Sequence, residues 1–269
     1  MRLLAVKAPV VKVFNKLDDI SLSDELLHGM IVKVIEETAG CNYLKVLTEY
    51  NYAGWCNKDC FCAAENIISY YSDADCLRIH SLTVDVMDRA DIKGKVLCTL
   101  VKGSIVYPVN VFENGWTKVL LASSSIGYIR TSSIVPYENM CGKKNIRRAI
   151  IEDALMYLGT QYRWGGKTPY GIDCSGLCSM AYLNNGMIIH RDSGWQDGYG
   201  IKQIPVSEAM PGDLLYFKGH IALYMGNDLF IHSTLGVYGD GVRINSLNKS
   251  HALYREDLLD KLICAGTLI

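Results

Sequence analysis

Two stretches of this chain, separated by about 73 residues, repeat the same succession of glycine, apolar run, turn and aromatic residue. The matching segments are 29–34 with 103–108, 43–47 with 116–120, and 54–55 with 127–128. Their offsets are 74, 73 and 73 residues. A fixed period of this length indicates two copies of one structural unit. The first half of the chain is therefore expected to fold as a tandem repeat.

Each copy reads as a set of short β-strands. Val32 and Leu44 belong to short runs of β-branched and aliphatic residues, which favour strands. Turn-forming residues follow these runs, at 37–42 in the first copy and 112–115 in the second. A unit of about 65 residues built in this way suits a small closed barrel, because closure leaves no unpaired edge strand. We predict one β-barrel for each copy.

The chain changes character after Pro136. Apolar residues then recur at helical spacing from Ile146 to Tyr157, and Gly159 follows as a stop signal. A second helix is expected from Cys174 to Tyr182. Turn residues set off three later strands, at 214–217, 221–225 and 229–233, the last two forming a hairpin. This order predicts an α+β domain. The 269 residues suit two or three domains, and we place three, at 1–70, 71–140 and 141–269.

The charge of the chain excludes some classes of partner. The formal net charge is −1, and each predicted domain carries nearly equal numbers of acidic and basic residues. No basic patch is therefore expected that would bind nucleic acid or an anionic membrane surface. No apolar run reaches the length of a membrane span, and the apolar stretch at residues 1–7 is too short for a signal peptide. We expect a cytoplasmic protein, or a secreted one if a leader has been removed.

Ten cysteines occur without any Cys-x-x-Cys pair, which removes the commonest zinc and redox signatures. Most of these thiols, including Cys178, are therefore expected to be small buried hydrophobic residues in a reducing compartment. The histidines at 28, 80, 190 and 251 fit no constellation and are expected at the surface.

Cys174 has the setting of a nucleophile. It opens the second predicted helix directly after Asp173, and the positive end of a helix dipole stabilises the thiolate, which is the reactive form of cysteine. A turn rich in glycine and aromatic residues, at 162–166, precedes it and suits the wall of a cleft. Trp164 in this turn either lines that cleft or packs in the core.

The predicted hairpin supplies a base for this nucleophile. His220 begins one strand and His232 lies on the next, and neighbouring strands are roughly 5 Å apart, so the two rings are expected to share a hydrogen bond. Cys174, His220 and His232 then follow the order of a nucleophile, its base and the group that orients the base. With Cys178 they are also zinc-ligand types, but a Cys-x-x-x-Cys pair on a helix is not a common ligand spacing. We expect no metal and no other cofactor.

Six motifs in one order span residues 157–247 of the chain. They are Tyr162-x-Trp164-Gly165-Gly166, Asp173-Cys174-Ser175-Gly176-Leu177, Arg191-Asp192-Ser193, Pro211-Gly212-Asp213-Leu214, Gly219-His220-Ile221-Ala222-Leu223-Tyr224 and Ile231-His232-Ser233. Together they resemble the NlpC-type cysteine peptidases, and the pattern of the two N-terminal copies resembles bacterial SH3-like domains. The resemblance implies an α+β fold class: a papain-like (NlpC-type) catalytic domain preceded by two small SH3-like β-barrels. It also implies the branch that hydrolyses γ-D-glutamyl-diamino-acid bonds of peptidoglycan stem peptides.

The resemblance implies a role for each matching residue. Cys174 is the expected nucleophile, His220 the general base and His232 the group that orients it. The backbone N–H of Cys174 and the hydroxyl of Tyr162 are expected to stabilise the tetrahedral oxyanion. The expected substrate-binding residues around the γ-D-glutamyl group are Trp164, Ser175, Arg191 and Ser193. Asp173 and Asp192 are expected near the site, with Asp192 preferred at the free amine of the N-terminal L-alanine, and Tyr52 is expected at the closed end of the cleft.

One position departs from the pattern of that branch. An acidic residue of the first domain meets the substrate amine there, whereas the matching position in this chain is Ser21, with Asp18 and Asp19 nearby. We expect a monomeric cysteine endopeptidase that acts on stem peptides with a free N-terminal L-Ala, in muropeptide recycling. The alternatives are a secreted cell-wall hydrolase with wall-binding SH3-like domains, a binding module with an inactive site, and an acyltransferase or amidase on the same scaffold. Lysine and diaminopimelate both stay open at the third stem position.

Overall fold

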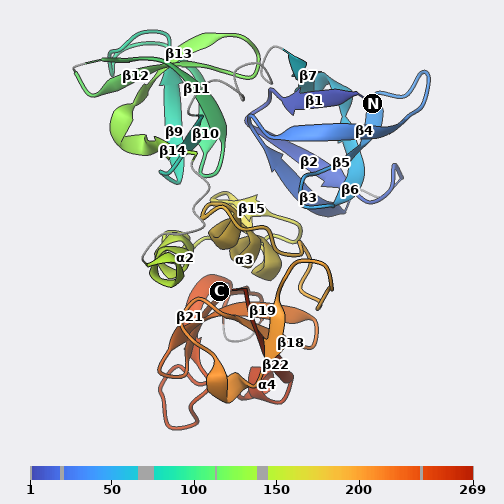
Figure 1. Cartoon of the computed structure of the whole chain (residues 1–269), viewed down its shortest axis with the longest axis vertical. Helices are drawn as coiled ribbons and strands as arrows, with labels where there is room; N and C mark the ends of the chain where they lie inside the picture. Colours follow the sequence, from blue (N-terminus) through green and yellow to red (C-terminus); the bar gives the residue numbers. More distant parts are fainter. Residues whose placement is uncertain are drawn as a thin grey trace. The chain divides into compact units, whose positions relative to one another are not determined.

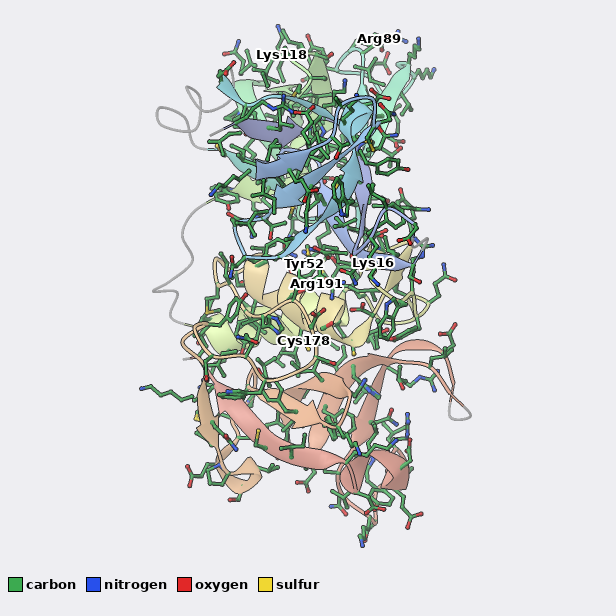
Figure 2. The ribbon with its side chains drawn as sticks, turned by 90° about the vertical axis from the view of Figure 1, so that its right-hand side faces the viewer. Lys16, Tyr52, Arg89, Lys118, Cys178 and Arg191 are labelled. Carbon is green, nitrogen blue, oxygen red and sulfur yellow. The ribbon has the colours of Figure 1, made fainter. Side chains whose placement is uncertain are left out.

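The computed structural model describes residues 2–18, 21–65, 76–112, 114–137, 145–236 and 239–268 (Figure 1; side chains in Figure 2). The chain divides into two compact units, Met1–Glu138 and Asn139–Ile269. The predicted boundaries near residues 70 and 140 lie outside the described residues, as do Asp19 and Cys141. The assignment of three domains therefore stays a prediction.

The described residues of the first unit form two sheets of seven strands each. The first sheet has the order β3-β2-β6-β5-β4-β1-β7 and contains β1 (Leu3–Val6), β2 (Val10–Phe14), β3 (Leu22–Leu27), β4 (Ile31–Glu37), β5 (Tyr43–Leu47), β6 (Ala53–Asn57) and β7 (Phe61–Ala63). The second has the order β10-β9-β13-β12-β11-β8-β14 and contains β8 (Leu77–Ile79), β9 (Thr83–Met87), β10 (Val96–Val101), β11 (Ile105–Phe112), β12 (Trp116–Leu120), β13 (Ile126–Arg130) and β14 (Ile134–Pro136). A short 3-10 helix precedes the last strand of each, at Lys58–Cys60 and Thr131–Ser133. Counted within each sheet, the two strand orders are identical, so the repeat in the sequence is a repeat of structure.

In both copies, the position before the repeated aromatic residue requires glycine for the same steric reason. Gly54 lies on β6 and Gly127 on β13. A Cβ at Gly54 would overlap Cγ1 of Val13, and a Cβ at Gly127 would overlap Cγ1 of Val86. The two valines stand at equivalent positions of the repeat, on β2 and β9. The same close approach of a valine therefore selects glycine twice.

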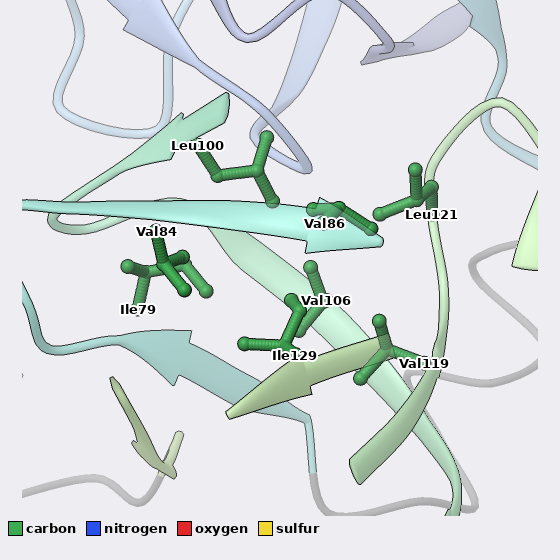
Figure 3. Packing of buried hydrophobic residues seen from close by; sticks show 8 residues of the cluster. All are labelled: Ile79, Val84, Val86, Leu100, Val106, Val119, Leu121 and Ile129. Carbon is green, nitrogen blue, oxygen red and sulfur yellow. The ribbon is translucent and has the colours of Figure 1, made fainter. Parts of the chain in front are cut away.

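The expected closed barrels are not confirmed. Within the described residues, each sheet has a linear hydrogen-bonded order, with β3 and β7 at the edges of the first and β10 and β14 at the edges of the second. Burial of apolar side chains between the strands stabilises these sheets. In the second sheet the core consists of eight aliphatic residues (Figure 3): Ile79, Val84, Val86, Leu100, Val106, Val119, Leu121 and Ile129.

His28 joins the two copies from a buried position. Its Nδ1 donates to the carbonyl of Lys7 (3.0 Å), and its Nε2 accepts from the backbone N–H of Ala122 in the second copy (3.1 Å). The expectation of a surface histidine is wrong here, because the side chain is 1% exposed and the second copy covers it, with Ile105 N–H bonded to its carbonyl (2.8 Å). Burial lowers the pKa of His28 to about 4, against the opposing effect of backbone hydrogen bonds to Lys7 and Ala8.

Acidification is expected to weaken the first unit through His28. The ring takes up a proton near pH 6.5 in the unfolded chain but only near pH 4 in the folded one. The contribution of the neutral His28 ring to the free energy of unfolding is therefore complete above about pH 6.5 and is lost as the pH falls towards 4. His28→Gln keeps an acceptor for Ala122 and removes the titration, so it should reduce the loss of unfolding free energy between pH 7 and pH 5 by about 2 kcal/mol. Denaturant unfolding at both pH values measures this. The exposed His251→Gln is the control, and an unchanged loss in His28→Gln would contradict the assignment.

The second unit packs helices against an antiparallel sheet. Six strands follow the order β17-β22-β18-β19-β20-β21. Helix α3 packs against α2 and against strands β19 and β20. The elements are α2 (Ile146–Leu155), β15 (Lys167–Thr168), β16 (Gly171–Ile172), α3 (Cys174–Leu183), β17 (Lys202–Ile204), a 3-10 helix (Val206–Glu208), β18 (Leu214–Phe217), β19 (His220–Gly226), β20 (Leu229–Thr234), β21 (Gly241–Ser246), α4 (Glu256–Leu259) and β22 (Leu262–Thr267).

Both predicted helices are confirmed, as α2 and α3, and so are the strand at 214–217 and the hairpin of β19 and β20. The hairpin turns at Asn227 and Asp228, whose φ angles are 51° and 62°, a left-handed conformation that Asn and Asp tolerate better than most residues. Strands β17, β21 and β22 were not predicted from the sequence. None of the described helices is long and apolar enough to cross a membrane.

Candidate active site

Cys174 is the first residue of α3, and its neighbours build that helix start. Asp173 is the N-cap, since its Oδ1 accepts from the N–H of Gly176 (2.6 Å) and satisfies a free donor of the first turn. Its Oδ2 accepts from the N–H of Gly165 in the preceding turn (2.7 Å). A Cβ at Gly176 would overlap the carbonyl of Gly166, so this turn packs directly on the helix backbone. Cys174 is thereby held, 6% exposed, at the positive end of the helix.

A buried ion pair supports this helix start. Arg191 is 1% exposed and donates from Nη1 to Oδ1 of Asp173 (3.2 Å) and from Nη2 to Oδ2 of Asp173 (3.3 Å). Its Nη1 also donates to Oγ of Ser175 (2.9 Å), which in turn donates to Oδ1 of Asp173 (3.2 Å). Figure 2 shows Arg191 and Cys178 in the part of the second unit that contains α3. The fold thus brings together Asp173, Ser175 and Arg191, which the sequence predicts to bind substrate, and their polar groups form hydrogen bonds with one another.

The two predicted histidines meet on the sheet. Neighbouring strands β19 and β20 bring Nε2 of His220 to 2.7 Å from Nδ1 of His232, with the rings crossing at 82°. His232 is fully buried, and its Nε2 lies 2.9 Å from Oδ1 of Asn245 on β21. The sequence did not predict Asn245. The signal that identifies it is the pairing of β20 with β21, which sets Asn245 opposite Phe230, two residues before His232.

Burial governs the protonation of Cys174. It raises the pKa of the thiol to about 11, and the carboxylate of Asp173 adds to the rise. Hydrogen bonds from the backbones of Ile221 and Ser175, followed by the charge of Arg191, act in the opposite direction. Ile221 follows His220 on β19, so its bond to the sulfur places Cys174 beside the start of that strand.

Burial also keeps both rings neutral. It lowers the pKa of His220 to about 4, with the positive charges of Arg255 and Lys261 adding to the effect and Asp257 opposing it. It lowers the pKa of His232 to about 3, where the charge of His220 adds and the hydrogen bond to Asn245 opposes. Burial thus favours the neutral form of the Cys174 thiol and of both imidazoles.

A neutral thiol at rest is a testable prediction. A thiolate absorbs in the far ultraviolet, whereas a thiol does not, so the difference between the wild type and Cys174→Ser reports the charge of this one sulfur. We expect no thiolate band at pH 7 and a rising band only as the pH approaches 11. Cys178→Ser is the control, because burial raises the pKa of that thiol well above its ordinary value. A band at pH 7 that disappears on acidification would instead show a thiolate–imidazolium pair.

The other predicted residues of this unit lie at different depths. Burial raises the pKa of the Tyr162 hydroxyl, and the charge of Cys174 adds to the rise. The backbone N–H of Tyr162 donates to Oδ1 of Asp240 (3.0 Å). Trp164 is 70% exposed, and the alternative of core packing is therefore wrong. Asp192 is exposed, and Ser193 is half-buried.

Tyr52 and Ser21 belong to the first unit. Tyr52 is half-buried, and its hydroxyl donates to the carbonyl of Ser23 on β3 (3.4 Å). Ser21 is exposed at the start of this segment. The same strand carries two buried acidic residues, Asp24 and Glu25. They were not predicted from the sequence, because the acidic position of the family pattern was matched to Ser21.

No group of three or more His, Cys, Asp and Glu in the described part of the chain is arranged to hold a metal ion. The nine cysteines in that part are free, and five of them are buried: Cys56, Cys76, Cys174, Cys178 and Cys264. Cys178 is fully buried in α3, which confirms it as a core thiol.

Known proteins resemble both the catalytic unit and the whole chain. The model of the NlpC/P60 family matches residues 159–258, which include Cys174, His220 and His232. Dipeptidyl-peptidase 6 of Lysinibacillus sphaericus is 42% identical over 252 residues, covering 92% of this chain and 92% of that protein. The gamma-D-glutamyl-L-lysine dipeptidyl-peptidase of Bacillus subtilis (strain 168) is 34% identical over 163 residues, covering 57% of this chain and 51% of that protein.

A solved structure shares the fold along the whole chain. The crystal structure of an NlpC/P60 family protein from Bacillus cereus ATCC 10987 has a TM-score of 0.81 at 19% identity and covers 98% of each chain. The second unit accordingly has the papain-like fold of the catalytic domain of that family. Because the Lysinibacillus relative is 42% identical over nearly its full length, the chain belongs to the NlpC/P60 family of cysteine peptidases.

Proposed function

We propose that this chain is a cysteine endopeptidase that hydrolyses the γ-D-glutamyl-diamino-acid bond of peptidoglycan stem peptides with a free N-terminal L-Ala. The proposal is carried by the 2.7 Å contact between His220 Nε2 and His232 Nδ1 beside a cysteine at a capped helix start. The name of the Bacillus subtilis relative supports the type of bond. Lysine and diaminopimelate both stay open at the third stem position.

The neutral resting site defines the proposed chemistry. The sulfur of Cys174 attacks the γ-carbonyl carbon while its proton moves to Nδ1 of His220. The C–N bond then breaks as this proton passes to the leaving amine, which leaves a thioester on Cys174. Water attacks the thioester, His220 takes a proton from the water and returns it to the sulfur, and L-Ala-D-Glu is released. The backbone N–H of Cys174 and the hydroxyl of Tyr162 stabilise the oxyanion in both steps.

Recognition is assigned to residues around this centre. The exposed ring of Trp164 and the hydroxyl of Ser193 contact the γ-D-glutamyl group in this proposal, and the exposed carboxylate of Asp192 binds the substrate amine. Arg191 and Ser175 act by holding the pocket wall at Asp173. Tyr52 is assigned to recognition of the free amine because it matches the tyrosine of the family pattern, in the segment 51–55.

The proposal extends to the role of the chain in the cell. The two strand-rich copies act as SH3-like domains, and the protein works as a cytoplasmic monomer that recycles muropeptides. A net charge of −1 supports a soluble peptide fragment as the substrate, because no charge attracts the chain to an anionic wall polymer.

Two synthetic tripeptides test the proposed function: L-Ala-γ-D-Glu-L-Lys and its N-acetylated form. We expect cleavage of the free-amine peptide, with L-Ala-D-Glu and lysine detected by mass spectrometry. We expect a loss of at least about 100-fold in kcat/KM for the acetylated form, since acetylation removes the positive charge that pairs with Asp192 and adds bulk at the amine. Equal cleavage of both peptides would contradict recognition of the amine and favour a cell-wall hydrolase with wall-binding domains. Binding to intact sacculi then measures that alternative.

A further inference from the structure

The group that orients the base in this site is itself a histidine, and a neutral histidine has two tautomers. A carboxylate in that position accepts a hydrogen bond whichever oxygen faces the base. An imidazole accepts only if its proton is on the far nitrogen. We propose that Asn245 is a positioning residue that fixes the tautomer of His232 and, through it, the tautomer of His220. This inference rests on the proposed use of Cys174, His220 and His232.

The orientation of the Asn245 amide is set by the backbone. Its Nδ2 donates to the carbonyl of Leu253 (2.9 Å), so its Oδ1 is the atom that faces His232, at 2.9 Å from Nε2. The carbonyl of Leu253 is itself held in place, because the N–H of Ser246 on β21 also donates to it (2.9 Å). An amide oxygen only accepts, so Nε2 of His232 carries the proton.

The direction of every further hydrogen bond follows from this one. His232 is neutral because burial lowers its pKa, so a proton on Nε2 leaves Nδ1 bare. The bare Nδ1 accepts from Nε2–H of His220 at 2.7 Å. His220 is then bare at Nδ1, the ring nitrogen left for the proton of Cys174. If His232 instead carried its proton on Nδ1, that nitrogen would donate to Nε2 of His220. His220 would then carry its own proton on Nδ1 and would present Cys174 with a hydrogen-bond donor in place of a base.

Charges around the two rings set the pH range in which both rings stay neutral and protonated at Nε2. Arg243 on β21, Arg255 before α4 and Lys261 after it lower the pKa of one or both rings, and Asp257 on α4 raises that of His220. Asn245 is 8% exposed and adds an acceptor at this point without adding a charge. An amide therefore fixes the tautomer while both rings stay neutral.

Two variants separate the acceptor from the charge. Asn245→Leu removes the acceptor at similar volume, whereas Asn245→Asp keeps it and adds a negative charge. Asn185→Leu is the matched control, because Asn185 is also buried (4% exposed) and donates its Nδ2 to a backbone carbonyl, that of Ala181 (2.8 Å), away from the histidines. The readouts are kcat and KM for the free-amine tripeptide, and nitrogen-15 NMR of the histidine rings, which reports each tautomer without activity.

In the wild type we expect both His220 and His232 to be protonated at Nε2 and bare at Nδ1. Asn245→Leu should lower kcat by about 100-fold or more with KM nearly unchanged, and a second tautomer should appear at His232. Asn245→Asp should keep kcat at neutral pH within about tenfold. Its charge stabilises imidazolium, so the acid limb of its kcat/KM profile should move to higher pH. Asn185→Leu should change neither tautomer nor kcat.

Several results would overturn the proposal. A wild-type His232 protonated at Nδ1 would do so even if Asn245→Leu fails to fold. The proposal is also overturned if Asn245→Leu keeps the kcat of the wild type and a single tautomer of His232. It is overturned as well if Asn245→Asp is as inactive as Asn245→Leu at every pH. Failure of the proposed function itself is recognised separately, since it appears as full activity in Cys174→Ala while the NMR result for the rings is unchanged.

Discussion

Replacement of Cys174 by alanine should lower kcat/KM for L-Ala-γ-D-Glu-L-Lys by at least about 10⁴-fold and leave the fold intact. The sulfur forms the thioester in the proposed reaction, and Cys178, the other thiol of the same helix, cannot take its place because it is fully buried. The fold should be preserved because the N-cap bonds of Asp173 to Gly165 and Gly176 do not involve the sulfur. Mass spectrometry of the released lysine measures the rate.

Cys178→Ala is the matched control for this variant. It removes a sulfur from the same face of α3, four residues further along, and should lower stability by about 1 kcal/mol while keeping kcat within about threefold. Thermal unfolding of both variants separates loss of chemistry from loss of structure. Full activity in Cys174→Ala would exclude the proposed nucleophile, and equal losses in both variants would show that the effect is structural.

Replacement of Arg191 by leucine should destabilise the catalytic unit by about 3–5 kcal/mol, because it leaves the buried carboxylate of Asp173 without its cation. Arg191 is 1% exposed and forms two bonds to that carboxylate, at 3.2 and 3.3 Å. The double variant Arg191→Leu with Asp173→Asn should recover part of the loss, since it removes the uncompensated charge and keeps an oxygen as N-cap acceptor. Denaturant unfolding, followed by a probe in the second unit, measures both values.

An exposed ion pair provides the control for Arg191→Leu. Arg148 and Glu152 on α2 form a bond of 2.6 Å with side chains that are 76% and 56% exposed. Arg148→Leu should therefore change the free energy of unfolding by less than about 0.5 kcal/mol. If Arg191→Leu costs no more than Arg148→Leu, Asp173 does not depend on its partner, and Arg191 is then free to act on substrate directly.

The sequence predicts local structure in this protein better than long-range contacts. The start of α3 was predictable because an acceptor at Asp173 and a small residue at Gly176 act within one helical turn. The hairpin of β19 and β20 was predictable because its turn residues, Asn227 and Asp228, suit left-handed backbone. Both features place predicted site residues, Cys174 on the helix and the two histidines on the hairpin.

The contacts that sequence reasoning missed depend on strand register or on burial between distant segments. Asn245 reaches His232 only through the register of β20 and β21, which no local signal gives. His28 was expected at the surface, yet it bonds Ala122, 94 residues away. Closed barrels were expected from the length of each unit, its short strands and its resemblance to SH3-like domains, but none of these determines which edge strands pair.

The paired positions of Gly54 with Val13 and of Gly127 with Val86 have a consequence for how this protein changes during evolution. A larger residue at either glycine is tolerated only when the facing valine becomes smaller, because a Cβ would overlap its Cγ1. Substitutions at the two members of each pair should therefore occur together among relatives, at the first pair and, independently, at the second. A relative with a side chain at only one of its two glycine positions would reveal which copy has diverged from their common ancestor, and a smaller residue should then face that side chain.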